Sequence, residues 1–465
     1  MESFSNVSTP EIRYTTERKR ILFATVPADG HFNPLTALAK HLVNEGYEVA
    51  WYAHDMYRKN ITALGVKHFP FIRPPKFNQE NFEFYYPERK KIKGAISKLR
   101  FDFQHAYLDT ARNYFDDIRE IFTAFPFDLV IADIMFSGIP YVKDKMQIPV
   151  IAVGIMPIME SSPELAPPGI GLTPAKNIFE KLRNRVLQFF AKKIIYSKLD
   201  KICTAQFQED GIEIPKTSVI DMLYSKPDLV LQSGSLAFEY HRKKFRPTLH
   251  FAGQLHPISK KAPTIDVLKK LKSSYDKLIL VTQGTIEKDP EKILVPVLKA
   301  FATSRILVVA TTGCSKTAGL KARFPQTNFY ITDFIPFAQV MPLADLYISN
   351  GGFGGVMMSI KYRVPMIVAG IYEGKNEICS RVGYFGAGIN LRTERPSAHD
   401  ILRAANQIFA NNSFAENLEK IARDFESFDA LQICSSQVSK LIGAPSIIAS
   451  IVSIKGKEDY HIKTA

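Results

Sequence analysis

The segment of this 465-residue chain that most clearly suggests chemistry is a glycine-rich turn between two apolar stretches. An apolar strand is expected at 345–349, the turn at Asn350 to Gly355, and a short helix after it. Backbone N–H groups at such a turn approach an anion closely, and the positive end of the helix dipole favours a phosphate. The spacing matches neither the P-loop GxxxxGK[ST] nor the dinucleotide-binding GxGxxG. The turn therefore predicts a phosphate site, and glycines that only permit a tight strand-to-helix turn are the alternative.

A histidine follows the first expected strand, which covers 20–26. His31 lies in a short loop, and a helix is expected to start after it with Asn33 as N-cap and Pro34 at its first position. Open α/β sheets place ligands and reactive groups at the carboxyl ends of their strands. His31 is thus a candidate for proton transfer, and an exposed polar side chain without chemistry is the alternative.

The composition is that of a soluble globular protein with material for two or three domains. Hydrophobic residues make up 46% and charged residues 23% of the chain. Four well-separated cysteines form no metal-binding spacing, which predicts buried thiols in a cytoplasmic protein without a metal site. The N-terminal segment has no apolar signal region and is expected to be a flexible lead-in. A monomer or weak dimer is expected.

Much of the net charge of +14 lies in two segments, 89–100 and 181–201. The second is both basic and amphipathic, so it could lie on an anionic membrane surface. We favour instead a solvated helix face whose apolar side lies in the core. No nucleic-acid-binding motif accompanies the charge, so nucleic acid is not an expected partner.

Strands alternating with helices predict an α/β protein with two doubly wound parallel sheets. The expected domains are 18–240, a linker at 241–262, 263–428, and a C-terminal helix and tail at 429–465 that returns towards the first domain. The first half has expected strands at 21–26, 48–52, 129–132, 150–153 and 228–232, and the second at 277–282, 305–310, 329–332, 346–349 and 366–369.

An aromatic-rich excursion at 77–107 interrupts the first half. Such an excursion in an α/β domain is typical of a binding lobe, and aromatic side chains favour flat apolar ligands. The candidates for contact with such a ligand are Phe82, Phe84, Tyr85 and Phe103. Packing of these rings against one another accounts for part of the pattern.

Four segments in this order give the chain a family resemblance: DGHFNPLTALAKHL, TQGT, DFIPFAQVMPLADLYISNGG and PMIVAGIYEGKNE. Together they resemble the family 1 glycosyltransferases, over roughly 20–442. The resemblance implies the GT-B fold, in which two Rossmann-like domains face each other across a cleft. It also implies an acceptor in the first domain and a nucleotide sugar, as co-substrate, in the second.

The resemblance also implies roles for individual residues. His31 matches the base of an inverting transfer, and Asp133 matches the carboxylate that orients it. The matches to the nucleotide-sugar site are Thr285, Phe334, Pro336, Gly351, Gly352, Gly354 and Gly355, with Phe334 in place of a base-stacking Trp. No DxD triplet is present, so neither a metal nor another cofactor is expected.

Three positions depart from the family pattern. Asn350 replaces a phosphate-binding His, Met358 replaces a Glu that binds ribose hydroxyls, and Gly374 and Lys375 replace an Asp/Gln pair that binds the sugar. Glu373 is adjacent to that pair and is a candidate substitute.

These departures favour dTDP-rhamnose as donor, because its ribose and its sugar each lack a hydroxyl, and UDP-glucose is the alternative. The expected acceptor is a lipophilic phenolic, flavonoid-like or polyketide-like molecule. Two other functions stay open: a catalytically silent nucleotide-binding scaffold, and glycosylation of a membrane lipid.

Overall fold

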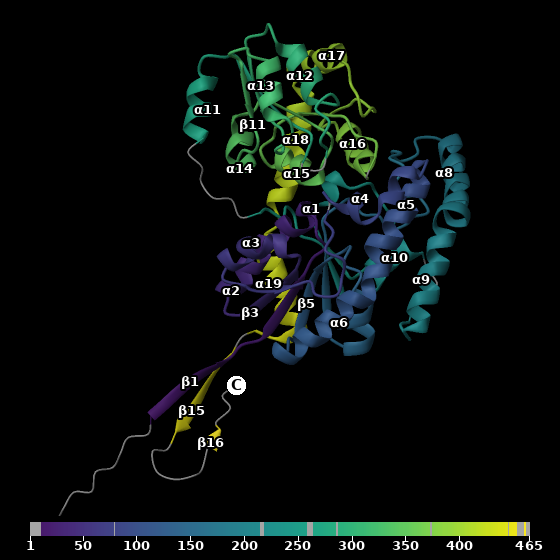
Figure 1. Ribbon diagram of the computed structural model, residues 1–465, viewed down its shortest axis with the longest axis vertical. Coiled ribbons are helices and arrows are strands. Elements are labelled where there is room, and N and C mark those ends of the chain that lie inside the picture. The colour runs from purple at the N-terminus through teal and green to yellow at the C-terminus, as the bar shows by residue number, and fades with distance from the viewer. Residues whose placement is uncertain are drawn as a thin grey trace, which may run out of the picture.

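The computed structural model describes residues 11–78, 80–213, 218–257, 264–284, 287–372, 374–444, 446–452 and 460–461. Within these ranges, side chains are not described at 11–17, 95–96, 446–452 and 460–461. The chain forms two lobes, each built on a parallel sheet covered by helices (Figure 1). This arrangement confirms the α/β, GT-B fold class expected from the sequence.

The first lobe contains a seven-stranded sheet in the order β4-β3-β2-β5-β6-β7-β8, and all of its strand pairs are parallel. Its strands are β2 (Arg20–Ala24), β3 (Glu48–Ala53), β4 (Lys67–Pro70), β5 (Leu129–Asp133), β6 (Val150–Gly154), β7 (Leu229–Gln232) and β8 (Leu249–Phe251). The helices are α1 (Asp29–Phe32), α2 (Thr36–Asn44), α3 (Arg58–Ala63), α4 (Phe82–Tyr85), α5 (Ala95–Phe103), α6 (Asp109–Ala124), α7 (Ile139–Tyr141), α8 (Ile178–Phe190), α9 (Ser197–Glu209) and α10 (Val219–Ser225).

The second lobe contains a six-stranded parallel sheet in the order β11-β10-β9-β12-β13-β14. Its strands are β9 (Lys277–Thr282), β10 (Ile306–Thr311), β11 (Phe329–Thr332), β12 (Leu346–Ser349), β13 (Met366–Val368) and β14 (Gly388–Asn390). The helices of this part of the chain are α11 (Thr264–Lys272), α12 (Leu294–Phe301), α13 (Thr317–Arg323), α14 (Phe337–Val340), α15 (Phe353–Lys361), α16 (Lys375–Tyr384), α17 (Ala398–Phe409), α18 (Ser413–Glu426) and α19 (Ala430–Ile442).

Most of the strands are apolar along most of their length, as is typical of parallel sheets whose two faces are covered by helices. In β2 and β5, alternate side chains enter different cores: Leu22 and Val130 on one face, Ile21 and Ile131 on the other. Two further cores enclose the second sheet in the same way. The ten strands expected from the sequence are all present, with ends that shift by up to two residues.

Two boundaries differ from the sequence-based expectation. The segment predicted to be a linker, 241–262, contains β8, which pairs with β7 and extends the first sheet. The predicted lead-in is also wrong at 11–17, where β1 (Glu11–Glu17) pairs antiparallel with β15 (Ser446–Val452), next to β16 (Tyr460–His461). This ribbon extends below the first lobe in Figure 1. The domain limits therefore stay a prediction in their details.

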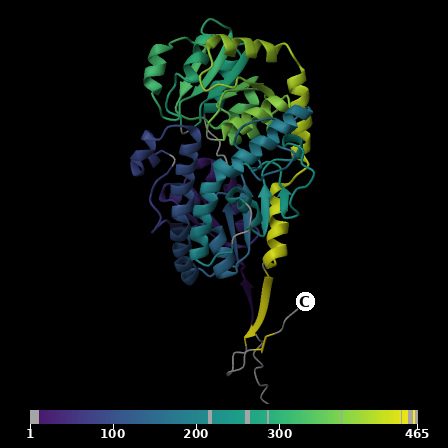
Figure 2. The same cartoon turned by 90° about the vertical axis from the view of Figure 1, so that its right-hand side faces the viewer.

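The last helix, α19, packs on the first lobe although it follows the second in the chain (Figure 2). Cys434 and Val438 of α19 enter one core of the first sheet. His41 Nε2 lies 2.9 Å from Ser435 Oγ, and Tyr47 donates a hydrogen bond of 3.4 Å to the Gly443 carbonyl.

The four cysteines were all expected to be buried. Three of them are buried, but Cys314 is exposed.

The second basic segment is oriented opposite to the arrangement we favoured. Its apolar side chains on α8 are exposed to solvent and do not lie in the core. Side chains on the other side of the helix, including Asn184, make the contact with the protein. Gln188 of α8 donates hydrogen bonds to the backbone carbonyls of Ser162 and Leu165, a tertiary contact that sequence periodicity alone does not reveal.

Candidate active site

His31 and Asp133 meet at the carboxyl ends of two adjacent strands. Asp133 is the last residue of β5, and His31 lies in α1, the first helical turn after β2. The helix begins at Asp29 rather than after the predicted N-cap Asn33, which has helical backbone angles. His31 therefore belongs to a helical turn whose N-cap is Ala28, and its side chain has a fixed direction.

The Asp133 carboxylate orients the imidazole ring. Its Oδ1 lies 2.9 Å from His31 Nδ1, and the Asp133 side chain is fully buried. The carboxylate also accepts hydrogen bonds from the backbone N–H groups of Val26, at 2.8 Å, and Met135, at 2.9 Å. An ionised carboxylate only accepts hydrogen bonds, so this pairing assigns the proton to Nδ1. Nε2, the opposite ring nitrogen, is then the atom able to receive a proton.

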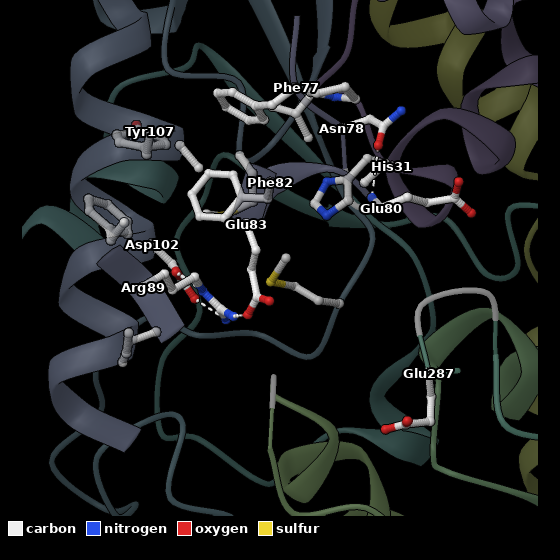
Figure 3. Close-up of a pocket in the computed structure, with 18 of the residues that line it drawn as sticks. His31, Phe77, Asn78, Glu80, Phe82, Glu83, Arg89, Asp102, Tyr107 and Glu287 are labelled. Carbon is white, nitrogen blue, oxygen red and sulfur yellow. Dashed lines mark hydrogen bonds and ion pairs between the residues drawn. The ribbon is translucent and has the colours of Figure 1, made fainter. Parts of the chain in front are cut away.

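His31 borders a cavity of about 790 Å³ (Figure 3). Apolar side chains from several elements form much of the wall: Val26, Phe77, Phe82, Leu99, Phe103, Tyr107, Met135 and Met156. Glu287 and Lys288 of the second lobe complete it, so the cavity lies between the lobes. Lys288 Nζ lies 3.3 Å from Glu80 Oε1 of the first lobe, which joins the two sides.

A charged cluster in the wall was missed by sequence reasoning. Arg89 makes a two-bond contact with Asp102, at 2.6 and 2.8 Å, and a third bond of 2.8 Å to Glu83. These bonds join the segment after α4 to α5, and the two carboxylates raise the pKa of Arg89 despite its partial burial. Arg89 belongs to a basic segment that reads as solvated in sequence, so no local signal distinguishes it.

The four predicted acceptor-contacting aromatics separate into two pairs. Phe82 and Phe103 line the cavity. Phe84 and Tyr85 do not line it, and Phe84 is 83% exposed. Phe84 is two residues after Phe82 in α4 and therefore points to the opposite side of the helix, while Tyr85 packs against Phe77 and Phe84. Phe77, Tyr107 and the two methionines occupy the wall instead.

The glycine-rich turn connects β12 to α15, as predicted. Gly351 has a φ of +80° and packs against Cys379, and a Cβ on Gly355 would collide with the Tyr347 hydroxyl. Gly352 and Gly354 have different surroundings, since a Cβ at either position would meet no atom closer than 3.9 Å. Gly351 and Gly355 are therefore required for packing, while Gly352 and Gly354 leave the N-terminus of the helix accessible to a ligand.

Asn350 has a structural partner in this arrangement. Its side-chain amide donates to the backbone carbonyl of Gln283 and is buried. The bond joins the loop after β9 to the glycine-rich turn, so Asn350 positions the two loops relative to each other. Thr285 and Glu373, both predicted to contact the nucleotide sugar, lie outside the described residues.

The other predicted donor contacts lie on three further elements of the second lobe. Phe334 lies in the loop after β11 and is 61% exposed, and Pro336 is the N-cap of α14. Met358 lies one helical turn after Gly354 on α15, half-buried against the core of the second lobe. Lys375 is the first residue of α16, and Gly374 precedes it in a left-handed conformation.

Within the described part of the chain, no group of three or more His, Cys, Asp or Glu side chains could hold a metal ion. The same part contains no helix that is long and apolar enough to cross a membrane. The side chains of the second lobe that border the cavity are Glu287 and Lys288.

Comparison with known proteins agrees with this arrangement. The family model for UDP-glucoronosyl and UDP-glucosyl transferase matches residues 157–426, more than half of the chain. The 4'-demethylrebeccamycin synthase of Lentzea aerocolonigenes is 30% identical, covering 89% of this chain and 97% of the relative. UDP-glucosyltransferase B1 of Starmerella bombicola is 25% identical, covering 91% and 99%.

A solved structure shares the fold. The glycotransferase of kitacinnamycin superposes with a TM-score of 0.69 at 16% identity, covering 92% of this chain and 100% of its own. The match to the family model and the similarity to a full-length relative give the same assignment. The chain belongs to the UDP-glucoronosyl and UDP-glucosyl transferase family.

Proposed function

We propose that this protein is a metal-independent, inverting glycosyltransferase that moves a hexose or 6-deoxyhexose from a nucleotide sugar to a hydroxyl of a lipophilic phenolic or polyketide-like molecule. The observation that carries the proposal is the His31–Asp133 pair at the wall of the interlobe cavity. In the proposed step, His31 Nε2 takes the proton of the acceptor hydroxyl as its oxygen attacks the anomeric carbon. The bond from that carbon to the nucleoside diphosphate breaks at the same time.

The leaving diphosphate needs stabilisation of its negative charge. The open N-terminus of α15 at Gly352 and Gly354 supports such a role, because its N–H groups and dipole favour phosphate oxygens. The exposed face of Phe334 supports stacking of the nucleotide base. In the proposed mechanism, the N–H groups and dipole of α15 stabilise the charge of the diphosphate without a metal ion.

The shape and chemistry of the cavity support a lipophilic acceptor. A volume of about 790 Å³ accommodates a multi-ring molecule, and the aromatic and methionine side chains favour flat apolar ligands. The name of one relative, 4'-demethylrebeccamycin synthase, agrees with a natural product as acceptor.

For the donor, we favour dTDP-rhamnose over UDP-glucose. Met358 occupies a position beside the accessible turn where a carboxylate would bind ribose hydroxyls, and a thioether cannot replace it. A 2'-deoxyribose has no 2'-hydroxyl, so it loses fewer hydrogen bonds at such a site than a ribose does. The loss of the Asp/Gln pair at Gly374 and Lys375 likewise favours a sugar with fewer hydroxyls.

The test is a panel of phenolic and polyketide acceptors incubated with dTDP-rhamnose or UDP-glucose, in the presence of a chelator, with products identified by mass spectrometry. We expect a product that gains one deoxyhexose, product formation by His31→Ala that is slower by about 10²–10⁴-fold, and an inverted anomeric centre by NMR. Binding of a nucleoside diphosphate without any product would instead support a silent scaffold. Activity that requires an added metal ion would contradict the proposed mechanism.

A further inference from the structure

Helix α8 presents its apolar side to solvent. At 100° per residue, the exposed large apolar side chains of α8 fall on one side of the helix, within about a third of its circumference, and the partly buried Leu187 lies outside this third. Phe179 is 80% and Phe189 is 60% exposed, although residues of this kind are usually buried. The exposed apolar side chains of this segment are Ile178, Phe179, Leu182, Val186, Phe189, Phe190 and Ile194.

The opposite side of α8 makes the contacts with the protein. Asn184 and Ala191 are buried there. Gln188 donates hydrogen bonds to the backbone carbonyls of Ser162, at 2.8 Å, and Leu165, at 2.5 Å. The hydrogen bonds fix the helix on the body of the first lobe with its apolar stripe outward. In Figure 2, this helix crosses the front of the molecule rather than lying inside it.

Basic side chains flank the apolar stripe. Within α8, on a helical projection, Lys181 and Arg185 lie along one edge of the stripe and Arg183 lies along the other, and Lys192 and Lys193 follow in the π-helical turn 191–196. From 178 to 198 the chain contains six basic residues and one acidic residue, Glu180. An apolar stripe between basic edges is the arrangement of helices that lie in the headgroup region of an anionic bilayer.

We propose that α8 docks this protein on an anionic lipid bilayer, with its apolar stripe among the acyl chains and its basic edges on lipid headgroups. Charge complementarity selects this occupant, because both edges carry the sign that attracts anionic lipids. The stripe lies on a convex helix and so matches a planar, deformable surface. The proposal does not depend on sugar transfer, since docking is measured without a substrate.

The docking helix is connected to the cavity wall. Arg100 of α5 donates a 3.1 Å hydrogen bond to the carbonyl of Ile195, just after α8. Leu99 and Phe103 of the same α5 line the cavity. Figure 1 shows α5 and α8 on the same side of the first lobe. Docking through α8 therefore brings the cavity near the membrane surface, where a lipophilic acceptor is concentrated.

The test is flotation of the full-length protein with vesicles of phosphatidylcholine alone or mixed with phosphatidylglycerol. We expect binding to the anionic vesicles, which falls as salt is raised, and little binding to the neutral ones. The double variant Phe179→Ser, Phe189→Ser should lower the partition coefficient by at least about tenfold. Lys181→Gln with Arg185→Gln should lower it by roughly fivefold for each charge removed.

Matched controls change the same residue types elsewhere on the surface. Leu402→Ser on α17 removes another exposed apolar side chain, and Lys321→Gln with Lys420→Gln removes two exposed charges. These variants should bind anionic vesicles nearly as well as the wild type does. Circular dichroism of every variant checks that the fold is retained.

Three outcomes would overturn the proposal. The first is failure of the wild type to float with anionic vesicles, and the second is equal flotation with neutral ones. The third is concentration-dependent self-association, measured by light scattering and abolished by the Phe179→Ser, Phe189→Ser variant without any vesicle binding. That result would assign the stripe to a second copy of the chain.

Discussion

Arg381 of α16 donates a hydrogen bond to Glu239, which lies in the segment after β7, and both side chains are buried where the two lobes meet. Arg381 also pairs with Glu377 at 3.0 Å, and its guanidinium lies 4.1 Å from the centre of the Tyr240 ring. Burial disfavours the charge on Arg381, but Glu239 and Glu377 outweigh it and raise the pKa. Glu377 in turn accepts the N–H groups of Gly169 and Gly171, at 2.9 and 2.8 Å.

Glu239→Gln should destabilise the protein by about 3 kcal/mol, because it leaves a buried guanidinium with one carboxylate in place of two. The measurement is the urea dependence of unfolding. Glu419→Gln is the matched control, since its partner Arg363 belongs to a pair at the surface, and it should cost less than about 1 kcal/mol. Equal losses in the free energy of unfolding for the two variants would show that the buried pair contributes no more to stability than the surface pair.

His31→Ala should reduce turnover by about 10²–10⁴-fold and leave the affinity for a nucleoside diphosphate nearly unchanged, because only the base is lost. Asp133→Asn should also reduce turnover, since an amide cannot accept from Val26, Met135 and His31 as a carboxylate does. Steady-state kinetics and calorimetry separate the two effects. Wild-type rates with an unactivated acceptor in the His31 variant would contradict the assignment of the base.

Phe334→Ala should weaken binding of a nucleoside diphosphate by roughly 1–3 kcal/mol, by analogy with stacking of bases on aromatic side chains. The ring is exposed, so its removal leaves no cavity in the core and should not change stability. Phe84→Ala, at another exposed aromatic, is the control for calorimetry. An affinity equal to that of the control would remove Phe334 from the nucleotide site.

The sequence predicted the two sheets because their strands are buried on both faces and therefore appear as short apolar runs. It did not reveal β8, whose three residues follow a charged segment and pair only at the sheet edge. It also assigned too late a start to the helix at His31. Pro34 is compatible with a first helical position, but here it follows a turn that already began at Asp29.

The parts of the candidate site that lie at a single strand end or on a single turn could be predicted from the sequence. His31, Asp133 and the glycine-rich turn satisfy that condition, and the structure brings the first two together. The cavity wall was only partly predictable, because it combines side chains from both lobes, such as Arg89 and Lys288. The outward orientation of α8 depends on Gln188 finding backbone carbonyls at Ser162 and Leu165, a tertiary contact that local periodicity does not encode.

His256 should make stability depend on pH in a defined window. Burial, and secondarily the nearby Lys361, lower its pKa from 6.5 to about 4. The unfolded chain then binds the proton more readily, so His256 contributes its full stability above pH 6.5 and loses it as pH falls towards 4. The free energy of unfolding should fall by on the order of 2–3 kcal/mol across this window.

The measurement for His256 is chemical denaturation at several pH values across that window. His256→Gln should flatten the dependence, whereas His399→Gln, which alters an exposed histidine, should leave it unchanged. If the free energy of unfolding depends on pH in the same way in the wild type and both variants, groups other than His256 cause the acid sensitivity.

Met358 should set the preference between nucleotides, if the nucleotide ribose lies at the open end of α15 as proposed. A 2'-hydroxyl beside this half-buried thioether loses water and gains no partner, which costs about 1–3 kcal/mol. The wild type should therefore bind dTDP at least about tenfold more tightly than UDP, a ratio that corresponds to ~1.4 kcal/mol. Met358→Glu should narrow or reverse the ratio by restoring an acceptor, while Met358→Leu should preserve it. The measurement is the pair of dissociation constants for each protein by calorimetry. Equal affinities in the wild type, or a preference for UDP, would remove the argument for a deoxyribose and make UDP-glucose the favoured donor.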